Sequence, residues 1–173
     1  MWGTIREVRY PHLESTDSIR VSEFLDRGQQ VTLLWYFASW CWNCNQQISS
    51  INEIYEDYNR QELGILGIGV YSPPGELQEF VEEYAVTFPV VVGPTQVKDL
   101  QARKQTHHYQ LRKATGDQRT WGTPFHLFID ASDRSRVYIG AGELREPELR
   151  RFLEVHIRHK GSKCSMNESR IKD

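Results

Sequence analysis

The chain has 173 residues, of which 39% are hydrophobic, 12% aromatic and 25% charged, and its formal net charge is −2. This profile is typical of one soluble globular domain and excludes a disordered or fibrous protein. The balanced charge argues against nucleic acid as a partner, and no stretch reaches the roughly 18 apolar residues of a membrane segment.

The N-terminal thirty residues are polar and irregular in pattern, so we expect the apolar core to begin at Val31. They contain charged side chains and no apolar stretch of the signal-peptide type. Taking Met1 as the native start, the sequence predicts a cytoplasmic protein. An extracytoplasmic location is the alternative if a leader or anchor has been removed. We expect a monomer.

The middle of the chain has a strand–helix–strand pattern. The β-branched and aromatic run 31–37 predicts a strand that is buried on both faces. Apolar residues at helical spacing after Cys44 predict a helix, and the run 64–71 predicts a second strand, parallel to the first. A helix is expected from Pro74 to about Tyr84, and 88–92 is expected to be an edge strand because of Pro89.

The last third is less regular. Residues 95–120 predict a partly helical segment that faces solvent. Its local positive charge is interpreted as a solvated helix face, and binding of an acidic partner is the alternative. Residues 125–130 and 136–141 predict an antiparallel hairpin. A last amphipathic helix is expected from about Glu146, ending by Gly161, and the polar tail is expected to be disordered.

Two cysteines lie between the end of the first predicted strand and the start of the helix that follows it, in the segment Trp40-Cys41-Trp42-Asn43-Cys44. Unpaired backbone N–H groups at a helix N-terminus stabilise a thiolate, so Cys41 is the predicted nucleophile. Two intervening residues bring Cys44 close enough to form a disulfide with it. Cys44 is therefore the predicted resolving thiol and is expected to be the more buried of the two.

The alternative for this pair is a zinc site, which needs four ligands. The sequence offers no second Cys-x-x-Cys pair. His107 and His108 are adjacent, so both side chains cannot easily face one metal ion from a helix. We therefore predict no metal. Cys164, in the polar tail, is interpreted as an incidental exposed thiol rather than a third redox centre.

A strand leads into Phe37-Ala38-Ser39-Trp40-Cys41-x-x-Cys44, a helix and a second strand follow, and Gly122-Thr123-Pro124 comes later, before a hairpin. The order of these elements resembles the thioredoxin superfamily. The phrase from Glu79 to Val90 and Phe128-Ile129-Asp130 are similar to the TlpA/ResA-like thiol-disulfide oxidoreductases. The resemblance implies an α/β thioredoxin-like fold, with a central mixed β-sheet flanked by helices. It implies an N-terminal extension over 1–19, a domain over 20–160 with an insertion at about 100–119, and a tail over 161–173.

The resemblance also implies roles for individual residues. Pro124 would be a cis-proline facing the disulfide, leaving the Thr123 backbone free to pair with a substrate strand; an ordinary trans-proline at a strand start is the alternative. Trp40 and Trp42 would belong to the substrate-docking surface, although Trp40 beside a strand end also fits a core position. His126 would either approach the site or serve as a buried structural histidine.

Three positions depart from the family pattern. Trp35 stands where thioredoxins place a buried aspartate that accepts a proton from the resolving thiol. Glu76 is a displaced candidate for that proton acceptor, and its alternative role is to complement the dipole of its helix. Ser49 replaces the usual helix proline, so the customary kink is expected to be absent.

These features predict a thiol-disulfide oxidoreductase that reduces protein disulfides through a mixed disulfide on Cys41. It needs no cofactor beyond the redox-active Cys41–Cys44 pair, and its partners are protein dithiol or disulfide substrates and an upstream reductant. A thioredoxin-fold adaptor with vestigial cysteines is the first alternative. The second is a peroxidase of the peroxiredoxin kind, which would need a threonine where Ala38 stands.

Overall fold

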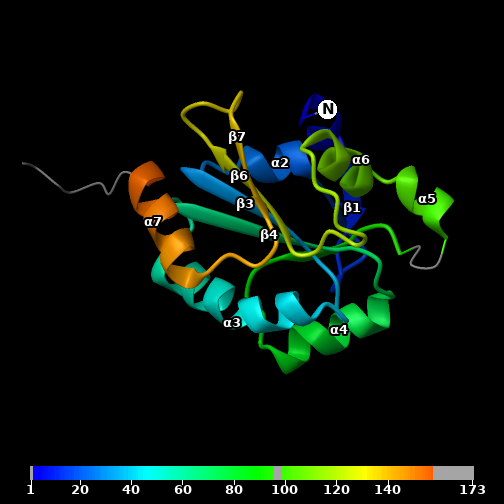
Figure 1. Cartoon of the computed structure of the whole chain (residues 1–173). Coiled ribbons are helices and arrows are strands. Elements are labelled where there is room, and N and C mark those ends of the chain that lie inside the picture. The colour runs from blue at the N-terminus through cyan, green and yellow to red at the C-terminus, as the bar shows by residue number, and fades with distance from the viewer. Residues whose placement is uncertain (1, 96–98, 158–173) are drawn as a thin grey trace, which may run out of the picture.

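A five-stranded mixed sheet forms the centre of the protein (Figure 1). The computed structural model describes residues 2–95 and 99–157. In spatial order the strands are β5 (Val90–Val92), β4 (Leu63–Gly69), β3 (Val31–Phe37), β6 (Phe125–Asp130) and β7 (Val137–Ala141). Strand β3 pairs in parallel with β4 and antiparallel with β6, so the expected thioredoxin-like α/β fold is confirmed, with β5 at an edge.

Strand β3 is central and buried on both faces, as its unbroken apolar sequence predicts. Because strand side chains alternate, Leu33, Trp35 and Phe37 enter one core cluster, whereas Leu34 and Tyr36 enter another on the opposite face. The strand thus links the two halves of the core, and its C-terminal end delivers the cysteine segment.

Helices α3 (Trp42–Asp57) and α4 (Pro74–Glu83) lie below the sheet in Figure 1, and α7 (Glu146–His156) lies at its left. Their buried apolar side chains, among them Ile48, Leu77 and Leu153, join the cluster that contains Trp35. This layer carries α3, whose N-terminus holds the cysteines.

The N-terminal segment covers the opposite face, and here the expectation of an irregular segment before the core is wrong. Helix α1 (Trp2–Arg6) and helix α2 (Val21–Leu25) flank a two-stranded sheet in which β1 (Arg9–Pro11) pairs antiparallel with β2 (Ser18–Arg20). Several of their side chains are buried in the second core cluster: Ile5, Tyr10, Ile19, Val21, Phe24 and Leu25. Val21, Phe24 and Leu25 have the i, i+3, i+4 spacing of a short helix, whereas Ile5, Tyr10 and Ile19 are isolated among polar residues and show no periodic pattern.

The segment before the cis-proline loop is helical, as expected, but it does not simply face solvent. Helices α5 (Leu100–Lys104) and α6 (His107–Ala114) lie at the same side of the sheet as α2 (Figure 1). His108 and Arg112 are buried, and the His108 ring stacks on Tyr36 of β3 at 5.0 Å between ring centroids. A solvated helix face is therefore not the right description of α6.

No helix in the described part of the chain is long and apolar enough to cross a membrane. Helix α7 ends at His156, and the tail over 161–173 with Cys164 lies outside the described residues.

The burial of α2 generates a stability prediction. Phe24 is 3% exposed within the second core cluster, so Phe24→Ala is expected to lower the free energy of unfolding by about 3–5 kcal/mol. Urea denaturation followed by circular dichroism measures the change. Val155→Ala, at a side chain that is 74% exposed, is the control and is expected to have little effect. An equally small effect of Phe24→Ala would mean that α2 is only peripheral to the core.

Candidate functional site

The two cysteines lie where β3 ends and α3 begins. Cys41 is the N-cap residue of α3: its backbone is extended, with φ −82° and ψ 111°, and its sulfur accepts a hydrogen bond from the Cys44 backbone N–H at 3.4 Å. The sulfur thus occupies the place that a serine or aspartate oxygen takes at other helix N-termini. The sequence-based placement of the pair at a strand-to-helix junction is confirmed.

The surroundings of Cys41 favour its thiolate. The pKa of the Cys41 thiol is lowered to about 6, chiefly by a hydrogen bond from the Cys44 side chain. Burial opposes this shift, while the Thr123 side chain and the backbone of Cys44 and Asn43 add to it. Cys41 is therefore largely ionised at neutral pH, as a nucleophilic thiol must be.

Cys44 has the opposite environment. It is fully buried, whereas Cys41 is 7% exposed, and both are free thiols. Burial raises the pKa of Cys44 well above the ordinary value, and the hydrogen bond and charge of Cys41 raise it further. The pair thus consists of one acidic thiol that is slightly exposed and one fully buried thiol that keeps its proton, and the expected order of burial is confirmed.

The loop before β6 lies against this pair. The Thr123–Pro124 peptide bond is cis, both residues are buried, and the Thr123 side chain lowers the pKa of both cysteines. The Thr123 carbonyl accepts a hydrogen bond from Arg119 Nη1 at 3.4 Å, and the Pro124 carbonyl accepts one at 3.2 Å. The expectation that the Thr123 backbone is free is therefore wrong for its carbonyl.

Aromatic side chains surround the exposed edge of the pair. Trp42 is 72% exposed, and Trp40 is partly exposed beside it. The Trp40 indole N–H donates to the Tyr71 carbonyl at 2.8 Å, and its ring meets Trp121 edge to face at 5.0 Å. Trp40 is thus fixed at the surface, so the core alternative for it is wrong.

Glu76 is exposed in the first turn of α4, where its carboxylate accepts a hydrogen bond from the Ser39 hydroxyl at 3.0 Å. Both residues line a groove of about 380 Å³ together with Trp40 and Asn45. The Ser39 backbone N–H donates to Ser72 Oγ, which ties the segment before Cys41 to the end of β4. Glu76 therefore helps to hold this segment in place.

Trp35, Ser49 and His126 have structural roles. Trp35 is fully buried and stacks on Phe37 at 4.5 Å, so this position is part of the apolar core. Helix α3 continues unbroken through Ser49. His126 is buried between Gln47 Oε1 at 3.0 Å and the Gly140 carbonyl at 3.2 Å, and burial lowers its pKa to about 4. It is a neutral structural histidine.

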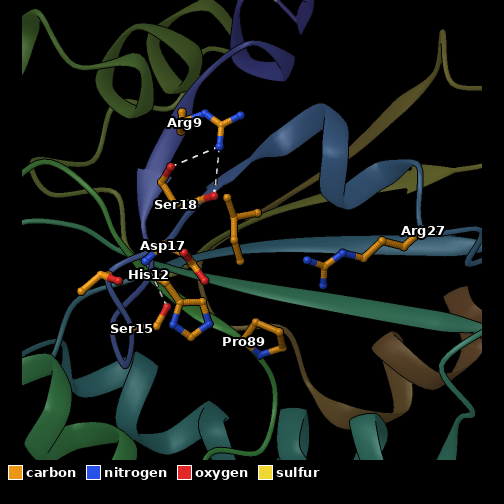
Figure 2. A pocket seen from close by; sticks show the side chains of 9 residues that line it. Arg9, His12, Ser15, Asp17, Ser18, Arg27 and Pro89 are labelled. Carbon is orange, nitrogen blue, oxygen red and sulfur yellow. Dashed lines mark hydrogen bonds between the residues drawn. The ribbon is translucent and has the colours of Figure 1, made fainter.

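Among the described residues, no group of three or more His, Cys, Asp or Glu side chains is arranged to hold a metal ion. A polar pocket of about 610 Å³ lies beside the β1–β2 segment and is also lined by Arg27 and by Pro89, which precedes β5 (Figure 2). Arg9 donates there to the Ser18 carbonyl and hydroxyl and pairs with Glu23, and Arg27 lies over the Phe24 ring. Both arginines are thus already engaged, and this pocket is separate from the cysteine site.

Sequence reasoning missed two groups at the site, Trp121 and the pair Asp117–Arg119. All three residues closely precede the Thr123–Pro124 segment in the chain, which is the one signal that could have indicated them. Their contacts depend on the fold of the 100–119 insertion, for which the family resemblance offers no template.

Comparison with known proteins agrees with this geometry. Residues 8–134 match the AhpC/TSA family. The thiol-disulfide oxidoreductase ResA of Geobacillus kaustophilus is 30% identical over 73 residues, which span 42% of this chain and 40% of that protein. The chain therefore matches less than half the length of this curated relative.

Solved structures show the same fold. A secreted Mycobacterium tuberculosis disulfide oxidoreductase homologous to E. coli DsbE superposes with a TM-score of 0.64 at 17% identity, covering 88% of this chain and 98% of that one. A DsbF homologue from Corynebacterium diphtheriae gives a TM-score of 0.64 at 18% identity, covering 87% and 85%. Because the family match covers most of the chain, the protein belongs to the AhpC/TSA family, as a ResA-like member of the thioredoxin superfamily.

Proposed function

We propose that this protein is a thiol-disulfide oxidoreductase that reduces disulfides in protein substrates, with Cys41 and Cys44 as its catalytic residues. The observation that carries the proposal is the contrast between the two thiols: Cys41 has a pKa of about 6, while the pKa of Cys44 is raised well above the ordinary value. The names of the ResA relatives support the same activity.

In the first step the Cys41 thiolate attacks one sulfur of the substrate disulfide. A bond forms between Cys41 Sγ and that sulfur, the substrate S–S bond breaks, and the departing thiolate takes up a proton from solvent. The backbone N–H of Cys44, which points at Cys41 Sγ, stabilises the attacking thiolate.

In the second step Cys44 resolves the mixed disulfide. Burial is the main cause of the raised pKa of Cys44, and the negative charge of Cys41, which adds to it, is lost once Cys41 is bonded to substrate. Cys44 can then lose its proton and attack Cys41 Sγ, which releases the second substrate thiolate and leaves a Cys41–Cys44 disulfide. Two electrons have passed to the substrate, and an upstream dithiol reductant returns the pair to its reduced form.

The acidity of Cys41 supports the proposed direction of electron flow, from this protein to the substrate. Thiol pKa values are about 7 in thioredoxin, a reductant, and about 3.5 in DsbA, a strong oxidant. A pKa of about 6 places Cys41 nearer to the reductant.

The neighbouring residues fit a docking surface for an extended protein segment. We propose that Trp40 and Trp42 pack against apolar substrate side chains next to the disulfide, and that Thr123 and Pro124 position the substrate backbone. Glu76 is left out of the proton transfers because its carboxylate is exposed and bonded to Ser39. The monomeric state and the cytoplasmic location stay predictions.

Replacement of the nucleophile tests the activity directly. Cys41→Ser is expected to abolish reduction of insulin disulfides, because the serine hydroxyl is not ionised at neutral pH. Cys44→Ser is expected to accumulate a mixed disulfide with substrate, visible on a non-reducing gel, because nothing resolves it. Cys164→Ser is the matched control and is expected to retain full activity.

Two other outcomes would contradict the proposal. Retained partner binding with no redox activity in the wild type would identify an adaptor with vestigial cysteines. Saturable consumption of peroxide that depends on Cys41, without insulin reduction, would identify a peroxidase.

The acidity of Cys41 has its own test. In a Cys164→Ser background, the rate of iodoacetamide alkylation is expected to rise with pH through a midpoint near 6. Cys44→Ala removes the side-chain donor and should move this midpoint toward about 8.5, whereas Cys44→Ser keeps a hydroxyl donor and should move it less. Because the folded-state pKa is depressed, this thiolate stabilises the reduced fold at alkaline pH, and the stabilisation is lost as pH falls through about 6. Equal midpoints in the two variants would contradict the assigned role of Cys44.

A further inference from the structure

Arg119 connects the insertion to the loop beside the cysteines, and the proposed function does not use it. Its guanidinium has two sets of partners: the Asp117 carboxylate on one side, and the Thr123 and Pro124 carbonyls on the other. One planar side chain therefore spans from the end of the insertion to the cis-proline segment.

Asp117 is a fixed anchor for this span. Its side chain is only 4% exposed, and it accepts from Arg119 Nε at 3.0 Å and from Nη2 at 2.8 Å. Burial alone would raise the pKa of the Asp117 carboxyl, but the hydrogen bonds from Arg119 and Arg112 hold it well below its usual range. The carboxylate thus stays ionised, and the Arg119 fork has a rigid, charged partner.

The same anchor holds a second arginine behind the loop. Arg112 of α6 is fully buried and donates through Nη1 to Asp117 Oδ2 at 3.2 Å and to the Arg119 carbonyl at 3.0 Å. Its guanidinium packs directly on Gly122, where φ is +70° and an added Cβ would lie 1.9 Å from Arg112 Nη1. The loop is therefore fixed from behind by Arg112 and across its carbonyls by Arg119.

The position of Thr123 is what this bracing controls. The Thr123 side chain lowers the pKa of both cysteines, and its hydroxyl oxygen is enclosed by protein and makes no hydrogen bond in the structure. A hydroxyl stabilises a thiolate only at hydrogen-bonding distance, so the position of the loop decides whether the Thr123 hydroxyl can donate to the Cys41 thiolate.

We infer that Arg119 is a positioning residue, which ties the Asp117 anchor to the Thr123 and Pro124 carbonyls and so holds the Thr123 hydroxyl against the cysteine pair. The inference rests on the proposed function in that the reactive thiol is Cys41. It adds a role for the insertion: Arg119 acts through Thr123 and does not touch the reacting sulfurs itself.

The test measures the reactivity of Cys41 in the reduced full-length chain with Cys164→Ser as background. Alkylation by iodoacetamide is followed against pH for Arg119→Gln, Arg119→Lys, Thr123→Val and the double variant Arg119→Gln/Thr123→Val. Arg136→Gln is the matched control, because Arg136 pairs with Asp133 at the exposed hairpin turn.

Loss of either Arg119 or Thr123 is expected to move the Cys41 midpoint upward. A rise of about one pH unit would slow alkylation at pH 6 about five-fold. Lysine keeps the charge but lacks the planar fork, so Arg119→Lys should also slow the reaction. The double variant should be no slower than Thr123→Val alone, because both changes remove the same contact. Arg136→Gln should match the parent.

Several results would overturn the inference. If Arg119→Lys behaves as the parent while Arg119→Gln is slow, the charge acts directly and not through the loop. Additive effects in the double variant, or an unchanged midpoint in Thr123→Val or in both Arg119 variants, would also refute it. Asp117 keeps Arg112 as a partner in these variants, so we expect them to fold. Circular dichroism checks the folding of each variant. If Arg119→Gln unfolds, Arg119→Lys is compared with the parent instead.

Alkylation requires no turnover, so this result is independent of the activity assay. A parent protein whose Cys41 midpoint lies near 6 but which reduces no disulfide would contradict the proposed function and leave the positioning role intact.

Discussion

The site depends on the close contact between Cys41 and Cys44 across the first turn of α3, in which the side chain and the backbone N–H of Cys44 both donate to the Cys41 sulfur. It exists because a buried strand, β3, ends where α3 begins, so that the reactive sulfur caps the helix. The same turn buries Cys44 behind Cys41, and the hydrogen bond between the side chains lowers the pKa of one thiol while it raises that of the other. The nucleophile and the resolving thiol thus differ because of the hydrogen bonding and burial that this one turn imposes.

The second requirement is a fixed surface opposite the sulfurs. The loop containing Thr123 and Pro124 provides it, and its carbonyls are held by a short ionic network that begins at Asp117. A buried carboxylate shared by two arginines is rigid because displacement of either partner leaves charge uncompensated. The insertion therefore contributes to the site even though the reacting atoms lie elsewhere.

The sequence was sufficient for the sheet and the cysteines, because long apolar runs and a Cys-x-x-Cys at a strand end are strong local signals. It was insufficient for the N-terminal segment, where isolated apolar residues such as Tyr10 and Ile19 are buried once β1 pairs with β2. It also did not predict the partner of the Thr123 carbonyl. Arg119 has no local pattern that distinguishes it from a surface arginine, and its role follows only from the buried Asp117 beside it.

The reduction potential of the Cys41–Cys44 pair tests the central claim most directly. Equilibration in glutathione and dithiothreitol buffers can be followed by tryptophan fluorescence, since Trp40 and Trp42 flank the pair. A reversible two-electron transition is expected between about −270 and −180 mV, as for a reductant somewhat more oxidising than thioredoxin. A potential above about −180 mV would reverse the proposed direction of electron flow, and the absence of any reversible transition would contradict a redox function altogether.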